Sequence, residues 1–183
     1  KNNQINLNKW FPHNDGGTAR KWYGNRNHII NWEKNGFAIK QQRNSTIRNP
    51  SYYFKAGVTW TDIASSFFCA RLVDEGFIFE NTGSMVFSNN LITTLGLLNS
   101  KVVFYYMNLM NPTLHFGVGE INKLPFDVQA ANEENIKVCV QLSKYDWDSY
   151  ETSWDFTQNP IIRSQQPNLE LAFNTWQQQN ADA

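Results

Sequence analysis

The residue types that could do chemistry are concentrated in the first 60 residues, where cationic and aromatic side chains alternate. The stretch GGTARKWYGNRNH, residues 16 to 28, combines three glycines with Arg20, Lys21, Arg26 and a Trp-Tyr pair. Lys and Arg neutralise phosphates, and Arg can also pair with a guanine edge through two parallel hydrogen bonds. This combination favours a surface that binds nucleic acid.

A second group of such residues lies in the polar run QQRNSTIRNPS, residues 41 to 51, which we predict to be an exposed loop. Its Gln, Asn and Thr side chains are types that pair with adenine or with phosphate. For any single residue, a solvated loop over buried aromatic rings is the simpler interpretation. The cluster as a whole favours DNA. The candidate DNA-contacting residues are Arg20, Lys21, Trp22, Tyr23, Arg26, Gln41, Gln42, Arg43, Asn44, Arg48, Lys55 and Trp60.

Other kinds of site have weaker support. GGTARKWYG follows no apolar strand and lacks the GxGxxG and GxxxxGK[ST] spacings, so its glycines predict a turn and not a phosphate loop. Asn-Pro-Ser-Tyr, residues 49 to 52, resembles the Asn-Pro-Pro-Tyr of amino-methylating enzymes, but Ser51 replaces the second proline and no cofactor loop precedes it. We therefore predict no catalytic and no cofactor-binding residue in this chain.

Metal and hydrolytic chemistry are equally unsupported. Two cysteines and three histidines are scattered without ligand spacing, which predicts no metal site and favours a reducing cytoplasm. No serine lies in a GxSxG motif. The acids of DWDSYE, residues 146 to 151, are interpreted as a solvated helix start. No apolar run is long enough to span a membrane.

The charge is unevenly distributed along the 183 residues, although the formal net charge is zero. Residues 1 to 55 hold ten Lys or Arg and two acids, whereas residues 56 to 183 hold six and fourteen. Such asymmetry indicates either a polyanionic partner or two segments of the chain that face each other. Charge alone leaves both interpretations open.

The elements that must position these residues predict an α+β fold. An N-terminal curved or partly open sheet, mixed or antiparallel, is expected from the strand candidates FAIK (37–40), YYFKAGVTW (52–60) and EGFIFEN (75–81). Apolar spacing predicts a helix pair over 91 to 110, broken at Asn99-Ser100 and stopped at Asn111-Pro112. A short strand near 118 to 126, with Pro125 at an edge, and acidic C-terminal helices follow.

Five ordered motifs carry a resemblance to a known family. KWFPHNDGGTARKWYGN, NWEKNGFAI, YYFKAGVTW, LGLLNSKVVFYYMNLMNPTLHFGVGEINKLPF and DWDSYETSWDF resemble the target-recognition region of PglX-type adenine-specific DNA methyltransferases from BREX phage-defence systems. The fourth stretch is also similar, more loosely, to target-recognition domains of restriction-modification specificity subunits. The resemblance covers most of residues 9 to 160.

The resemblance implies a fragment of an N6-adenine DNA methyltransferase whose catalytic half lies upstream and carries S-adenosylmethionine. Residues 1–128 would then form a target-recognition domain and residues 129–183 a C-terminal helical segment. Expected partners are double-stranded DNA, the upstream methyltransferase domain and other subunits of the defence system, with no membrane. One alternative is a protein-interaction module that docks a partner subunit or the acidic half of its own chain, and another is a nuclease.

Overall fold

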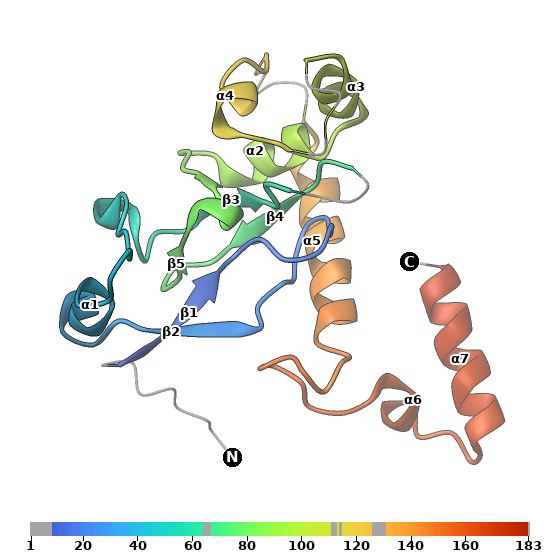
Figure 1. Ribbon diagram of the computed structural model, residues 1–183. Helices are drawn as coiled ribbons and strands as arrows, with labels where there is room; N and C mark the ends of the chain where they lie inside the picture. The colour runs from blue at the N-terminus through green and yellow to red at the C-terminus, as the bar shows by residue number, and fades with distance from the viewer. Residues whose placement is uncertain (1–8, 64–66, 111–112, 114, 126–130, 183) are drawn as a thin grey trace.

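The computed structural model describes residues 9–63, 67–110, 113, 115–125 and 131–182, and its elements combine two small sheets with helices (Figure 1). In the first sheet, β1 (Trp10–Asn14) lies between β2 (His28–Asn31), to which it is antiparallel, and β5 (Ile78–Phe79), to which it is parallel. The α+β class and a sheet of mixed direction are therefore confirmed.

The second sheet is antiparallel and forms the centre of the main core. Its central strand β3 (Gly57–Trp60) pairs with β4 (Ala70–Val73) and with β6 (Met85–Val86). All four residues of β3 are buried, as the apolar and β-branched sequence GVTW favours. Predicted strand YYFKAGVTW is confirmed only in this last part, because Tyr52 belongs to a 3₁₀ turn, η1 (Pro50–Tyr52).

The helix pair predicted over 91 to 110 is confirmed as α2 (Leu91–Leu98) and α3 (Lys101–Met110). The side chain of Asn90 accepts a hydrogen bond from the Thr93 amide at the start of α2, and Ser100 accepts one from the Val103 amide at the start of α3. Leu95, Leu98 and Met107 point into the core around Trp60. The predicted stop at Asn111-Pro112 lies outside the described residues.

The C-terminal part is helical, as predicted. Helix α5 (Glu133–Trp147) begins with two acids in its first turn, and α6 (Pro160–Arg163) and α7 (Leu169–Ala181) follow. Helix α2 approaches α5 closely because Gly96 has no side chain and faces Ile136. In Figure 1, α6 and α7 lie to one side of the main body, beyond α5. The predicted domain boundary between residues 128 and 129 lies outside the described residues and stays a prediction.

Two predicted strands are wrong. FAIK is helical, within α1 (Glu33–Lys40), where Lys34, Asn35 and Gly36 adopt left-handed backbone angles before the chain coils. The Phe37 side chain is exposed to solvent, so this segment does not bury its aromatic residue against a sheet as the strand prediction required. The strand expected near 118 to 126 is replaced by α4 (Val118–Ile121), and Pro125 lies in no strand. Of EGFIFEN, only Ile78 and Phe79 form a strand, and the 3₁₀ turn η2 (Asn81–Gly83) follows it.

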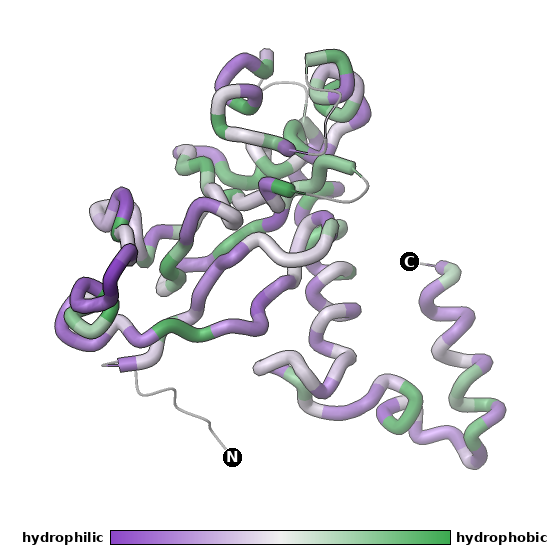
Figure 2. Tube along the Cα trace, viewed as in Figure 1, coloured by the Kyte–Doolittle hydropathy of each residue, from purple (hydrophilic) through white to green (hydrophobic). Residues whose placement is uncertain are grey.

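The exposed loop predicted after α1 is confirmed, and Figure 2 shows this part of the chain as more hydrophilic than α2 and β3. None of the helices that the structure describes combines the length and the apolar character that a membrane crossing requires.

Candidate nucleic-acid interface

The glycine turn, residues 16–26, is held from beneath by a buried arginine. Gly16 and Gly17 have φ values of +85° and +75°, so the prediction that they shape a turn is confirmed. Arg71 on β4 is fully buried and donates hydrogen bonds to the carbonyl oxygens of Gly16 (2.5 Å) and Arg20 (3.3 Å). Burial lowers the pKa of Arg71 to about 10, which still leaves the side chain protonated at neutral pH.

Two polar side chains complete this support. Asn25 donates through its side-chain amide to the carbonyl oxygens of Gly16 and Thr18, at 2.7 Å each. Thr61 accepts from Arg71 at 3.1 Å and donates to Gly16 at 3.3 Å. The sequence prediction listed Trp22 and Tyr23 as candidate DNA contacts, and it missed Arg71. A cation in the middle of the apolar strand ARLV is the signal that could have identified it.

Arg20 does not project freely from the turn. Its guanidinium forms an ion pair with Asp146 near the end of α5, at 2.5 Å between Nη2 and Oδ2, and lies 5.1 Å from the centre of the Trp147 ring. Asp146 was predicted to belong to a solvated helix start. The prediction is wrong, because α5 ends at Trp147 and its last turn binds the glycine turn.

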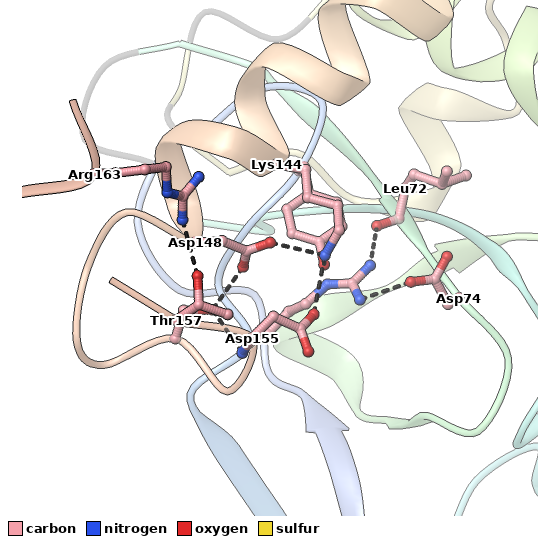
Figure 3. Close-up of polar contacts among 10 residues, drawn as sticks. Leu72, Asp74, Lys144, Asp148, Asp155, Thr157 and Arg163 are labelled. Atoms are coloured by element: carbon pink, nitrogen blue, oxygen red, sulfur yellow. Dashed lines mark hydrogen bonds and ion pairs between the residues drawn. The ribbon is translucent and has the colours of Figure 1, made fainter. Parts of the chain in front are cut away.

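Tyr23 is buried and is the second point of attachment. The ammonium of Lys144 donates to the Tyr23 hydroxyl at 3.0 Å and also contacts Asp148 (2.8 Å) and Asp155 (2.9 Å), as Figure 3 shows for the two carboxylates. Partial burial lowers the pKa of Lys144, but the hydrogen bonds that its ammonium donates to Asp148, Tyr23 and Asp155 raise the pKa by more, so it lies above its usual value. We call Tyr23, Lys144, Asp148 and Asp155 the docking cluster.

The remaining cations of the turn also have partners within the chain. Arg26 pairs with Asp74 at 2.7 Å, donates to the Leu72 carbonyl at 3.3 Å and lies 3.9 Å from the centre of the Tyr23 ring (Figure 3). Lys21 donates to the Asn99 carbonyl at 3.2 Å. The Trp22 backbone pairs with β4, and its half-buried ring packs against the main core. The turn thus faces its own chain more than it faces solvent.

Trp60 needs a correction. It is fully buried, and its indole nitrogen donates to the Phe116 carbonyl at 2.6 Å. A ring enclosed by the main core cannot stack on a base, so Trp60 supports the fold and is not a surface contact.

The polar loop, residues 41–49, has the opposite character. Gln41, Gln42, Arg43, Asn44 and Arg48 are all exposed. Its start is held by Ser45, whose hydroxyl donates to the Ile39 carbonyl at 2.5 Å, and its end by half-buried Ile47 packing on a small second core. That core contains Trp32, Tyr53 and Ile78. The loop is therefore anchored at both ends while its polar side chains face outward.

Cations on and beside this loop lack acidic partners. Residues 33 to 55 hold five Lys or Arg and a single acid. Within the described part of the chain, none of the five forms an ion pair with a carboxylate. Lys55 lies 4.9 Å from the Tyr52 ring centre and is exposed. The five are Lys34, Lys40, Arg43, Arg48 and Lys55.

The structure thus divides the predicted contact residues into two sets. Arg20, Lys21, Trp22, Tyr23 and Arg26 are engaged within the chain, whereas the members from Gln41 to Lys55 face solvent. Across the described ranges, no group of three or more His, Cys, Asp or Glu side chains is placed to hold a metal ion.

Comparison with known proteins gives two matches to longer enzymes. The chain is 38% identical to the adenine-specific methyltransferase BrxX of Escherichia coli O9:H4 (strain HS) over 84% of its own length and 13% of that protein. It is 34% identical to the adenine-specific methyltransferase PglX of Lacticaseibacillus casei (strain Zhang) over 98% of its length and 16% of that protein. No protein-family model matches the sequence.

Both matches confirm the resemblance that the five motifs carry. The chain is homologous to a segment of these adenine-specific methyltransferases and spans between 13% and 16% of their length.

Proposed function

We propose that this chain, homologous to a segment of the BREX adenine-specific methyltransferases, recognises double-stranded DNA for such an enzyme. Catalysis and S-adenosylmethionine binding would lie elsewhere in the polypeptide. The polar loop and Lys55 would form the contact surface, with Arg43, Arg48 and Lys55 on phosphates and Gln41, Gln42 and Asn44 available for base edges.

One observation carries this proposal: the unpaired cations of residues 33 to 55 beside the paired cations of the glycine turn. A cation with a carboxylate partner must break that contact before it binds phosphate, whereas an unpaired exposed cation needs only to release counterions. Amides that can pair with adenine lie in the same loop. The combination of free charge and hydrogen-bonding side chains supports sequence recognition.

The internal contacts of the glycine turn account for part of the charge asymmetry in another way. Arg20 and Tyr23 bind the acidic end of α5 and the segment after it, so one portion of the basic residues 1 to 55 docks on the acidic half of its own chain. In the proposed function, the docked turn positions the first sheet, and Ile47 of the polar loop packs on the second core beside that sheet.

The test exchanges residues 41–49 between two related methyltransferases and maps N6-methyladenine across the genome by sequencing. We expect the methylated sequence to change toward that of the loop donor while the rate of methylation is retained. An exchange of residues 169–181, which are in α7, serves as the control. If the methylated site is the same after the loop exchange, recognition lies elsewhere.

A further inference from the structure

A groove of about 620 Å³ runs beneath the polar loop. One wall is the loop itself, with Asn44, Thr46 and Arg48. The opposite wall is the chain after β5, with Glu80 and Asn81. This volume is within the range of sites that bind small organic groups.

Aromatic rings of the second core form the floor of the groove. Trp32 and Tyr53 pack edge to face, with ring centres 5.1 Å apart, and Tyr53 meets Phe79 in the same way at 5.3 Å. Trp32 and Tyr53 each retain 8% exposure, and both line the groove. The floor is therefore formed by packed aromatic rings, a surface on which a flat apolar ring can be buried.

The two walls carry opposite charges. Arg48 supplies a positive charge to the lining and Glu80 a negative one. The Glu80 carboxylate already accepts a hydrogen bond from the Thr82 hydroxyl at 2.7 Å. A carboxylate repels a phosphate but accepts from an exocyclic amine, which adenine and cytosine have and thymine lacks. His13 in the same groove contributes little positive charge at neutral pH, because burial lowers its pKa despite opposing effects of Glu80 and Asp15.

We propose that this groove takes up one unstacked base of bound DNA, preferring a base with an exocyclic amine. The base would lie on the aromatic floor with its amine toward Glu80, and its phosphate would stay at the rim beside Arg48. The inference rests on the proposed function, because it requires DNA at the polar loop. Extruding a base costs stacking energy, and that cost is smallest for a base that is already unpaired.

The test compares the affinity of the intact polypeptide for a perfect duplex and for the same duplex with a single bulged cytosine or thymine. We expect the bulged cytosine to tighten binding on the order of tenfold, since its stacking is already lost. Asn81→Trp, which fills the groove from the side of the chain after β5, removes this preference and changes affinity for the perfect duplex less than about twofold. Ser51→Trp, an exposed position outside the groove lining, keeps the preference.

A second plug, Thr46→Trp, fills the groove from the loop side and is also expected to remove the preference for bulged cytosine; because Thr46 lies in the contact loop, its readout is the ratio of bulged to perfect duplex affinity. Glu80→Gln should reduce the advantage of cytosine over thymine, because an amide no longer favours a donor over an acceptor. A preference for bulged DNA that survives both plugs, or its absence from the unmodified protein, would overturn the inference. The loop exchange tests a different readout, the methylated sequence, so either idea can fail while the other holds.

Discussion

Arg20 in the glycine turn forms an ion pair with Asp146 in the last turn of α5, although the two residues are separated by 126 positions. The pair is reinforced by Trp147, whose ring lies against the same guanidinium. Arg20 is one of the ten cations of residues 1 to 55. Because its guanidinium is paired with Asp146, this positive charge stabilises the fold and does not face a partner.

A double-mutant cycle of Arg20→Gln and Asp146→Asn measures this contact. Asp146 is 54% exposed, so solvent screens the pair and we expect a coupling energy of about 0.5 kcal/mol. A charge-swapped protein, Arg20→Asp with Asp146→Arg, should recover part of the stability lost in either single reversal. A coupling energy near zero would mean that the ion pair adds nothing to the packing of Arg20 on Trp147.

Replacing Arg71 by Met should loosen the glycine turn locally. The Arg20 carbonyl loses its donor, whereas Gly16 keeps Asn25 and Thr61, so the loss is partial. We expect amide exchange of residues 15–25 to accelerate on the order of tenfold, or about 1.4 kcal/mol. Hydrogen-exchange mass spectrometry of the intact polypeptide measures it, and peptides from α7 serve as an internal control. Unchanged exchange at residues 15–25 would contradict the bracing role.

Gly16→Ala should destabilise the chain more than Gly76→Ala. Both glycines have positive φ, +85° and +95°, so both substitutions carry the left-handed backbone cost of about 1 kcal/mol. Only at Gly16 would the new methyl group also meet the Thr82 carbonyl, whereas Gly76 faces open space. Thermal unfolding of the two variants measures the difference, and equal losses would show that the close approach is unimportant.

Cys69 should resist alkylation. Its side chain is 1% exposed, and burial raises the pKa of the thiol despite the nearby Arg71 and a hydrogen bond from the Arg20 amide. We expect iodoacetamide at pH 8 to modify Cys69 at least about tenfold more slowly than the half-buried Cys139. Peptide mass spectrometry over a time course gives both rates in one sample. Comparable rates would indicate that the β4 edge opens frequently.

The unpaired cations should set the salt dependence of DNA binding. Each phosphate contact contributes a slope of about 0.9 in the logarithm of affinity against that of salt concentration. Replacing Arg43, Arg48 and Lys55 by Ala should therefore flatten the slope by up to about 2.7. Arg163→Ala, whose guanidinium binds Thr157 far along the chain, is the matched control. A slope that is equally reduced by the control would place the contacts elsewhere.

Local patterns in the sequence predicted α2, α3 and the C-terminal helices, but they missed α1 and α4 and identified the site only in part. The spacing of Leu95 and Leu98 and the Asn99-Ser100 break are local signals, and both agree with the structure. The role of FAIK depended instead on whether a sheet was available to pair with it, which local sequence does not contain. The exposure of the polar loop follows from its composition, whereas the pairing of Arg20 with Asp146 depends on two segments meeting in space.

The docking cluster also bears on how the chain acquires its fold during synthesis. Tyr23 and Lys144 are 121 positions apart, so the glycine turn gains its final contacts only after α5 has emerged from the ribosome. Contacts between distant segments form late, since a long loop must first be closed. Until then Tyr23 lacks the hydrogen bond from Lys144. The glycine turn therefore stays accessible to chaperones for a longer time than the strands β1 and β2, which are close in sequence and can pair early.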